Sequence, residues 1–199
     1  MSTQRKARVE RKTSETDISI ALNLDGSGKS NIKTPIGFLN HMLTLLSKHG
    51  LFDLSLKARG DTEVDIHHTN EDIGICLGQA FSKALANKAG IKRFGLASVP
   101  MDEALVEVSL DMSGRPYVKL LAVSFRLSAK AENYSLNYLK QFLQAMVNNA
   151  GITLHVEIVQ GEDLHHIIEA VFKALARALK EAVTLDSRIK GILSTKGRL

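Results

Sequence analysis

The sequence predicts an α+β fold that is built by internal duplication. Three observations support this prediction. The motif His-His-x-x-Glu occurs twice, at residues 67–71 and again at residues 165–169. Two glycines ten residues apart precede each copy, at positions 50 and 60 and then at positions 151 and 161. The strands and helices expected from hydrophobic spacing also follow the same order in both halves, which is typical of a duplicated unit.

The first half is predicted to contain strands at its start and a helix in its middle. Residues 5–11 and 17–24 alternate loosely between polar and apolar side chains and are rich in Val, Ile and Thr, which predicts two strands. Apolar residues at helical spacing predict a helix over residues 38–49, and the glycine that follows is well placed to cap it. A strand over residues 51–58 and a long helix beginning at His67 complete this half.

The same order returns in the second half. Strands are expected over residues 105–110 and 117–124, followed by a helix over residues 135–149, a strand over residues 152–159 and a helix that starts at the second His-His pair. Each half therefore has the order strand, strand, helix, strand, helix. We expect each half to form a four-stranded sheet that is covered on one face by helices.

The duplication divides the chain into three parts. We expect a first repeat over residues 1–92, a second over residues 93–186, and an irregular C-terminal tail over residues 187–199. A chain of 199 residues is long enough to bury a substantial core, so the two repeats are expected to pack as one compact unit.

The formal charge of +5 is concentrated at the two ends of the chain. Residues 1–12 carry five basic side chains and one acidic side chain, while residues 188–198 carry four basic side chains and no acidic one. The body between them is mildly acidic and has no basic stripe interleaved with aromatic residues, so we do not expect a nucleic-acid partner. A small anionic ligand bound by the basic tail fits this distribution better.

No segment is typical of a membrane protein or a secreted protein. Nowhere do about 18 apolar residues follow one another, and the first residues lack the apolar core of a signal peptide. We therefore expect a cytoplasmic protein that does not contact membranes. Cys76, the single cysteine, lies between Ile75 and Leu77 and is expected to be a buried, unreactive thiol.

The repeated His-His-x-x-Glu motif has the residue types and spacing of a metal site. On a helix, residues three and four apart share a face, so the Glu of each copy is expected beside both of its histidines. Adjacent side chains leave a helix about 100° apart, so one copy can give one ligand to each of two ions. A single pair could be only a polar first turn, but its repetition favours paired metal sites, each assembled from more than one copy. The spacing of His41 leaves core packing and metal ligation equally open.

Several further segments occur in a fixed order along nearly the whole chain. They are residues 8–16, 37–43, 93–95, 100–104, 113–116 and 194–197. Together with the two motifs, they make the sequence similar to the imidazoleglycerol-phosphate dehydratases of histidine biosynthesis. The resemblance implies a duplicated α+β fold of the ribosomal protein S5 domain 2 type. It also implies a hollow shell of twenty-four identical subunits, a homo-oligomer assembled from trimers.

The same resemblance implies an activity and a cofactor. Dehydratases of this kind are carbon–oxygen lyases that remove water from imidazole glycerol phosphate to give imidazole acetol phosphate, so this reaction on a small phosphorylated substrate is expected here. The resemblance also implies two Mn²⁺ ions per active site, at contacts between subunits. Nitrogen and carboxylate ligands suit other divalent transition metals as well.

The resemblance also implies roles for individual residues. The expected metal ligands are His41, His67, His68, Glu71, His165, His166 and Glu169. Catalysis is expected to depend on Glu15 as acid/base near the substrate hydroxyls, and on the ligands His41, His68, Glu71, His166 and Glu169. The phosphate is expected to bind Arg93, Arg115, Ser194 and Lys196. Guanidinium groups suit a phosphate because they donate two parallel hydrogen bonds, although outside these motifs both arginines would be ordinary surface residues.

One position departs from the family pattern. Gln141 lies in the helix expected over residues 135–149, where relatives usually carry a His or Glu able to reach a metal. A neutral amide oxygen is a poorer ligand for a divalent ion. We therefore expect one of the two ions to bind more weakly, or to have a water in place of this side chain. If the alignment shifts by one helical turn, Gln141 is instead a surface residue.

Two other functions fit the same motifs. A binuclear metal phosphohydrolase could use paired ions to activate water on a phosphate ester, although the basic tail and the lack of an Asp-rich cluster weigh against it. A non-enzymatic shell protein could use metal-bound histidines only to join its subunits. Formation of the ketone product from imidazole glycerol phosphate, with free phosphate measured in parallel, distinguishes the three functions.

Overall fold

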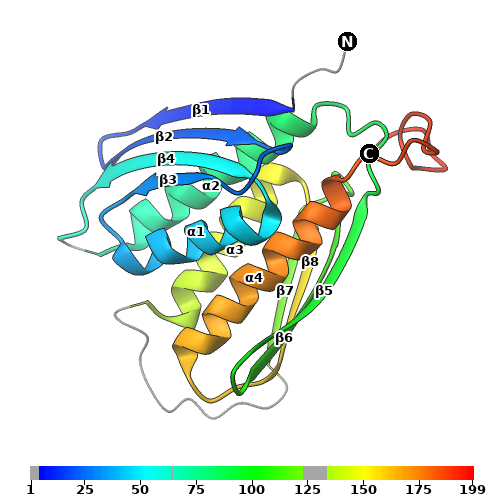
Figure 1. The fold of residues 1–199 in the computed structure, drawn as a ribbon. Coiled ribbons are helices and arrows are strands. Elements are labelled where there is room, and N and C mark those ends of the chain that lie inside the picture. The colour runs from blue at the N-terminus through cyan, green and yellow to red at the C-terminus, as the bar shows by residue number, and fades with distance from the viewer. Residues whose placement is uncertain (1–4, 64, 123–133) are drawn as a thin grey trace.

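The computed structural model describes residues 5–63, 65–122 and 134–199. In this part of the chain, two four-stranded sheets enclose four helices (Figure 1). In the view of Figure 1, one sheet lies above the helices and the other runs along their right-hand side. Each sheet packs one face against helices, which confirms the α+β fold expected from the sequence.

The first half contains the upper sheet of Figure 1 and two helices. Its sheet has the strand order β1-β2-β4-β3, in which β3 is parallel to β4 and the other neighbours are antiparallel. The elements of this half are β1 (Lys6–Lys12), β2 (Thr16–Asn23), β3 (Ser30–Lys33), α1 (Gly37–Gly50), β4 (Asp53–Gly60) and α2 (His67–Leu85).

The second half repeats this arrangement. Its sheet has the order β5-β6-β8-β7, and β7 is parallel to β8. Strand for strand, β5 to β8 therefore match β1 to β4, and the predicted duplication is confirmed. The elements are β5 (Phe94–Met101), β6 (Ala104–Asp111), β7 (Tyr117–Ala122), α3 (Leu136–Ala150), β8 (Thr153–Gln160) and α4 (Leu164–Val183).

The strands β3 and β5 were not predicted by the sequence pattern. Strand β3 has only four residues, three of them polar, so it shows no periodicity. In β5 the exposed positions include Phe94 and Leu96, which hides the alternation. This strand also contains Pro100, which an edge strand tolerates because the missing N–H can lie on the side that has no neighbouring strand. The two strands supply the fourth member of each expected sheet.

The helices of the two halves pack against each other and form one continuous core. Helix α1 packs on α4, and α2 packs on α3. Two glycines of α2 allow the second contact. A Cβ atom on Gly74 would lie 2.7 Å from the carbonyl oxygen of Phe142, and one on Gly78 would lie 2.3 Å from that of Met146. The close packing of α2 on α3 therefore requires glycine, which has no side chain, at these two positions.

The end of α1 differs from the expectation that Gly50 caps it. Gly50 is the last helical residue, and Leu51 adopts the left-handed conformation that closes the helix, with a φ of 57°. A Cβ atom at position 50 would lie 2.4 Å from the Phe52 ring. Glycine is therefore used to let this buried ring pack against the helix end, and the left-handed position passes to the next residue.

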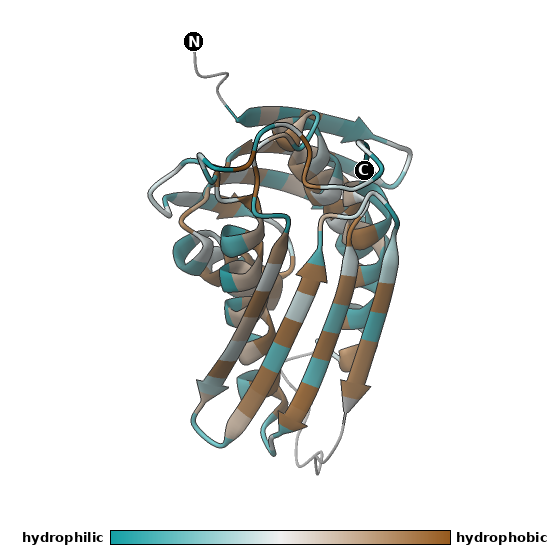
Figure 2. Cartoon of the chain, turned by 90° about the vertical axis from the view of Figure 1, so that its right-hand side faces the viewer, coloured by the Kyte–Doolittle hydropathy of each residue, from teal (hydrophilic) through white to brown (hydrophobic). Residues whose placement is uncertain are grey.

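Three further features concern the helices, the thiol and the outer surface of the second sheet. In the described part of the chain, none of the helices has the length and apolar character needed to span a bilayer. Cys76 is buried, and burial raises the pKa of its thiol to about 11, which confirms an unreactive side chain. The outer face of the second sheet, which faces the viewer in Figure 2, exposes apolar side chains that include Phe94, Leu96, Tyr117 and Leu121.

Candidate active site

Three side chains from two helices come together near the start of α4. Nε2 of His41, on α1, lies 3.2 Å from Oε2 of Glu169. Nε2 of His165 lies 3.5 Å from the same oxygen. Glu169 is buried, whereas His41 is exposed and His165 is half-buried. These three residues are called the Glu169 cluster below.

The Glu169 cluster has the dimensions of a metal site. One ligand atom from each residue lies within 4.8 Å of the other two. Ligand atoms bound to one ion at about 2.0–2.2 Å lie roughly 3–4 Å apart. The two His–Glu distances of 3.2 and 3.5 Å fall in this range. Imidazole nitrogen and carboxylate oxygen also suit a divalent transition metal, so the residues fit the expected ion.

Lys173 keeps the carboxylate of this cluster charged. Its Nζ lies 2.6 Å from Oε1 of Glu169. Burial by itself would raise the pKa of Glu169, but the hydrogen bonds from Lys173 and His41 outweigh burial and lower it. The group is therefore ionised at neutral pH, as metal ligation requires. Sequence reasoning gave Lys173 no role, and its only signal was the spacing of four residues after Glu169.

The first copy of the motif forms a similar pair at the start of α2. Nε2 of His67 lies 3.3 Å from Oε2 of Glu71. This spacing of four residues is the same as that of His165 and Glu169. Oδ1 of Asp65 accepts a hydrogen bond from the backbone N–H of His67 at 2.8 Å, which satisfies one free donor at the helix start. In both copies, the first histidine and the Glu share one helix face.

The second histidine of each pair contacts carboxylates outside the motif. Nδ1 of His68 lies 3.5 Å from Oε2 of Glu15 and 3.8 Å from Oδ1 of Asp61. Nδ1 of His166 lies 2.7 Å from Oε2 of Glu103. The Glu of each motif therefore pairs with the first histidine, whereas the sequence predicted that it would lie beside both.

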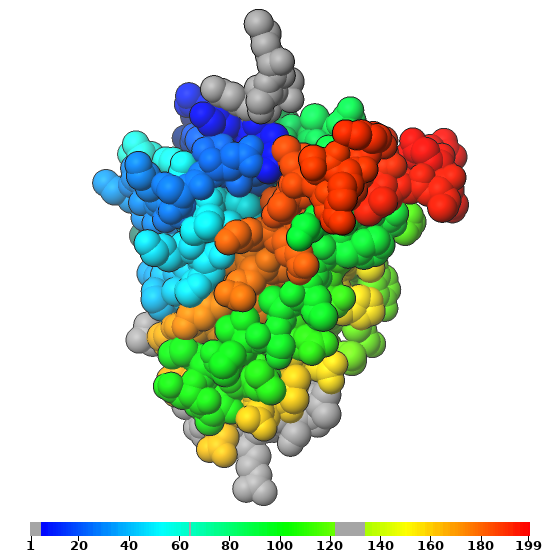
Figure 3. All heavy atoms as spheres, turned by 45° about the vertical axis from the view of Figure 1, so that its right-hand side comes forward, coloured from blue at the N-terminus to red at the C-terminus, as the bar shows by residue number. Residues whose placement is uncertain are grey.

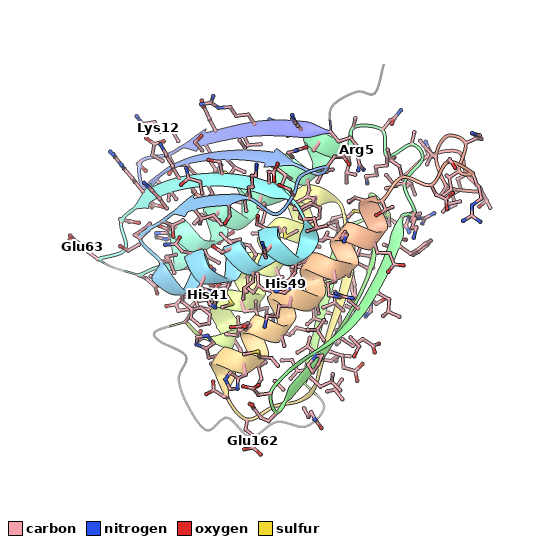
Figure 4. All side chains as sticks on the ribbon, viewed as in Figure 1. Arg5, Lys12, His41, His49, Glu63 and Glu162 are labelled. Carbon is pink, nitrogen blue, oxygen red and sulfur yellow. The ribbon has the colours of Figure 1, made fainter. Side chains whose placement is uncertain are left out.

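The two copies of the motif do not meet within one chain. Figure 4 shows Glu63 and Glu162, which precede the two copies, at separate corners of the molecule. Among residues 5–63, 65–122 and 134–199, the one group of three potential metal ligands is the Glu169 cluster. Two of the seven predicted ligands, His67 and Glu71, form a pair of their own, and His68 and His166 contact other carboxylates.

The C-terminal tail forms a basic pocket of about 730 Å³ beside the second half. Figure 3 shows the tail, in red, next to the green residues of that half. Ser194 lines the pocket together with six basic side chains, namely Arg93, Arg115, Arg188, Lys190, Lys196 and Arg198. All four residues that were expected to bind a phosphate therefore line the same pocket, which is called the tail pocket below.

Arg93 connects the tail to the rest of the fold. Its Nη1 donates a hydrogen bond to the carbonyl oxygen of Leu193, in the tail, at 2.7 Å. Its backbone N–H donates to the carbonyl oxygen of Ala182, near the end of α4, at 2.9 Å. The side chain of Arg115 is 70% exposed, and Lys196 is exposed as well. The tail pocket thus combines one guanidinium group that is fixed to the tail with more exposed basic side chains such as Arg115 and Lys196.

The tail pocket and the Glu169 cluster lie at opposite ends of α4. An α-helix rises about 1.5 Å per residue, so the segment from His165 to Ala182 spans about 25 Å. Figure 1 shows α4 running from the lower part of the molecule to the tail at the upper right. One small substrate cannot reach both places in the same chain.

Gln141 lies close to the first copy of the motif. It lines a pocket of about 280 Å³ that Glu71 also lines. Oε1 of Gln141 is buried and has no hydrogen-bond partner in the described part of the chain. A buried acceptor without a partner is costly, so this position favours a partner that the described residues do not supply. This position favours a role near Glu71 over that of an ordinary surface residue.

Sequence reasoning gave no role to Glu103 or Asp61, although each contacts a motif histidine. Both lie in turns at the ends of strands, where only the folded sheet brings them to the start of a helix. For Glu103 there was one signal, because it belongs to the segment 100–104 by which the family resemblance was found. For Asp61 the sequence showed only a turn after Gly60.

Comparison with known proteins identifies the family. A family model for imidazoleglycerol-phosphate dehydratase matches residues 34–179. The chain is 58% identical over 198 residues to an imidazoleglycerol-phosphate dehydratase of Caldanaerobacter subterraneus subsp. tengcongensis, covering 98% of this chain and 100% of the relative. It is 53% identical over 195 residues to one of Syntrophus aciditrophicus, covering 98% of both chains.

Solved structures agree with the sequence comparison. The crystal structure of the dehydratase of Staphylococcus aureus superposes with a TM-score of 0.80 at 38% identity, covering 91% of this chain and 99% of that one. The Pyrococcus furiosus enzyme in complex with (S)-C348 superposes with a TM-score of 0.82 at 37% identity, covering 96% and 100%. With its fold and its repeated motif, this chain therefore belongs to the imidazoleglycerol-phosphate dehydratase family.

Proposed function

We propose that this protein is a hydro-lyase that converts imidazole glycerol phosphate to imidazole acetol phosphate in histidine biosynthesis. The observation that carries the proposal is the Glu169 cluster, a possible metal site in a chain of the dehydratase family. The relatives named above carry the name of this activity and match nearly the whole chain. A basic tail pocket suited to a phosphate supports the same substrate.

The proposed cofactor is Mn²⁺, with two ions in each active site. The chain would hold them through imidazole nitrogens and carboxylates, which suit this metal and several of its neighbours. The Glu169 cluster supplies three ligands, and the pair of His67 and Glu71 supplies two more. The remaining histidines would complete the set, which consists of His41, His67, His68, Glu71, His165, His166 and Glu169.

The reaction needs an electron sink, because the proton to be removed sits on a carbon without a neighbouring carbonyl group. The histidines and carboxylates of the Glu169 cluster would hold a divalent ion, which would supply Lewis acidity to the imidazole ring of the substrate. We propose that Glu15 moves the proton. Its carboxylate is 52% exposed and lies 3.5 Å from Nδ1 of His68. An exposed carboxylate beside a ligand histidine can reach the substrate hydroxyls and exchange protons with them.

The residues of the tail pocket would bind the phosphate group. Arg93 and Arg115 offer guanidinium groups, and Ser194 and Lys196 add a hydroxyl group and a positive point charge. The backbone N–H of Lys196 donates to Oγ of Ser194 at 3.2 Å, which holds the Ser194 side chain against the backbone of the tail. We propose that residues 187–199 act as a phosphate-binding arm on the two repeats, residues 1–92 and 93–186.

The active site is proposed to form between copies of this chain. The Glu169 cluster and the tail pocket are about 25 Å apart along α4, which exceeds the length of a small phosphorylated imidazole. A neighbouring copy that places its tail pocket over this cluster would close the distance. The apolar outer face of the second sheet supports such contacts, because exposed apolar patches often mark subunit interfaces. Assembly of trimers into a shell of twenty-four subunits is the arrangement we propose.

The proposal is tested by incubating the Mn²⁺-loaded protein with imidazole glycerol phosphate. The ketone product and free phosphate are measured in parallel. Ketone without free phosphate is the expected result. Free phosphate would instead indicate a hydrolase, and neither product would indicate a shell protein without catalysis. His68→Ala is expected to abolish turnover, and the chelator-treated protein provides the metal-free control.

A further inference from the structure

Glu15 and Glu103 occupy equivalent positions in the duplicated fold. Glu15 lies in the turn between β1 and β2, where the backbone N–H of Thr13 donates to the carbonyl oxygen of Thr16. Glu103 lies in the turn between β5 and β6, where Met101 pairs with Ala104. Each Glu is the third residue of its four-residue turn. Each also places a carboxylate oxygen next to Nδ1 of the second histidine of a motif.

The two carboxylates differ in how firmly they are held. Oε1 of Glu103 accepts hydrogen bonds from the backbone N–H groups of Glu162 at 3.2 Å and of Asp163 at 2.8 Å. Its Oε2 lies 2.7 Å from Nδ1 of His166. Glu15 lies 3.5 Å from His68, which exceeds an ordinary hydrogen-bond length, and is 52% exposed against 35% for Glu103. Glu103 is therefore fixed between the loop before α4 and the imidazole ring.

The contact with Glu103 decides which nitrogen of His166 carries the proton. An ionised carboxylate can only accept hydrogen bonds, so Nδ1 must be the donor in a contact of 2.7 Å. In the neutral ring, Nε2 is then unprotonated, and its lone pair can bind a metal ion. Nε2 lies 3.7 Å from Oδ2 of Asp102, which is too long for a hydrogen bond, so Asp102 does not fix a proton on this nitrogen.

We propose that Glu103 is a positioning residue of the metal centre, which holds His166 with the proton on Nδ1 and so presents Nε2 as the metal-binding atom. The inference rests on the proposed function, since it assumes that His166 binds a metal ion. In this arrangement the duplicated turn has acquired two roles. Glu15, which is loosely held, moves protons, and Glu103, which is anchored, orients a ligand.

The tautomer of His166 tests the proposal directly in the metal-free wild-type protein. The ring nitrogens are labelled with ¹⁵N, and NMR spectra are recorded at alkaline pH, where imidazoles are neutral. The His166 signals are assigned by comparison with His166→Asn. We expect a protonated Nδ1 and an unprotonated Nε2. A protonated Nε2 would overturn the proposal, and this measurement requires neither catalysis nor a mutated Glu103.

The variant Glu103→Gln tests the effect on metal binding. Its amide oxygen can still accept from the two backbone N–H groups, while its NH₂ group faces Nδ1 and favours the proton on Nε2. We expect Mn²⁺ to bind one class of site about 10–100-fold more weakly, the range typical for loss of such a partner. The midpoint of thermal unfolding of the metal-free protein is expected to stay close to that of the wild type.

Glu15→Gln is the matched control, because it makes the same change at the equivalent position. It is expected to leave Mn²⁺ affinity unchanged and to lower kcat. Equal Mn²⁺ affinity in Glu103→Gln and the wild type would show that Glu103 only stabilises the loop before α4. If the wild type binds Mn²⁺ but forms no ketone product, the proposed function fails while the inference about His166 stands. If Glu103→Gln does not fold, the tautomer of His166 in the wild-type protein still tests the proposal.

Discussion

Arg93 and Asp111 form a bidentate ion pair. Nε and Nη2 of the guanidinium group donate to the two carboxylate oxygens at 2.7 and 2.9 Å. With Nη1 bonded to Leu193, three of the five N–H groups of Arg93 are used inside the protein. The remaining two can be offered to a phosphate in the tail pocket, and the ion pair keeps them in place.

Replacing Arg93 by Lys is expected to weaken substrate binding. An ammonium group cannot bridge Asp111, the tail and a phosphate at once, because it lacks the five N–H donors of a planar guanidinium group. A hydrogen bond to a charged group contributes about 1.5–3 kcal/mol, so KM is expected to rise about 10–100-fold. Turnover should change little, since the phosphate is held in both ground and transition states. Arg8→Lys, on β1 and 72% exposed, is the control and should leave KM unchanged. A fall in kcat at constant KM would contradict the phosphate assignment.

Removing metal is expected to disassemble the proposed oligomer. His ligands must be neutral to bind an ion, so mild acid releases the metal. If His67, His68 and His166 complete their coordination with groups from a neighbouring copy, the apo-protein should form smaller particles by light scattering. A chelator at neutral pH separates the effect of metal loss from that of acid. An unchanged particle after verified metal removal would show that the metal sites do not join subunits.

Gln141→His is expected to strengthen one metal site. An imidazole at this position would offer a better ligand than the buried amide oxygen, which has no hydrogen-bond partner among the described residues. Titration of the apo-protein should show two unequal classes of site, and the variant should tighten the weaker one by about tenfold, or about 1.4 kcal/mol. Gln144→His, in the same pocket, is the control. Two equally tight sites in the wild type would place Gln141 outside the coordination sphere.

Gly78→Ala is expected to destabilise the fold although alanine favours helices by about 1 kcal/mol. The added methyl group would lie 2.3 Å from the carbonyl oxygen of Met146 and would force α2 and α3 apart. Overpacking of this kind costs about 1–3 kcal/mol in the free energy of unfolding. Gly37→Ala, at the start of α1, meets no atom within 4 Å and is expected to be neutral. Denaturant unfolding at one protein concentration measures both variants, and equal stabilities would refute the close contact.

Asp53 is expected to make the protein sensitive to acid. Its pKa is lowered from the ordinary value of 3.8, mainly by hydrogen bonds from the backbone N–H groups of Ser27 and Lys29. A lowered pKa in the folded state contributes stability above the unfolded value, and this contribution is lost as the pH falls below it. Asp53→Asn should therefore lose less stability between about pH 4 and pH 2 than the wild type. Asp17→Asn, at a position of β2 that pairs with Arg59, is the control. Parallel stability curves for Asp53→Asn and the wild type would contradict this account.

The parts of the fold that were predictable are those with local causes. The helices and most strands follow from hydrophobic spacing, and the duplication follows from the repeated motif. The pairs His67–Glu71 and His165–Glu169 follow from helix geometry alone. The short edge strand β3 could not be predicted, because its four residues show no period and are ordered by pairing with β4.

The contacts that were missed depend on distant parts of the chain. Glu103 reaches His166 only because the turn between β5 and β6 lies beside the start of α4. His41 joins the Glu169 cluster through the packing of α1 on α4, so its spacing alone left two interpretations open. The family resemblance could name such residues. It could not show that the first histidine of each pair contacts the Glu of the motif, while the second contacts a carboxylate outside the motif.

Helix α4 carries the Glu169 cluster at one end and lies beside the tail pocket at the other. A deletion of one residue in this helix would shorten it by about 1.5 Å and rotate one end by about 100° relative to the other. Under the proposed assembly, both ends serve active sites that are shared with neighbours, so a single such deletion would misalign two sites at once. We therefore expect an insertion or deletion within α4 to be tolerated less well than a substitution at one of its exposed positions.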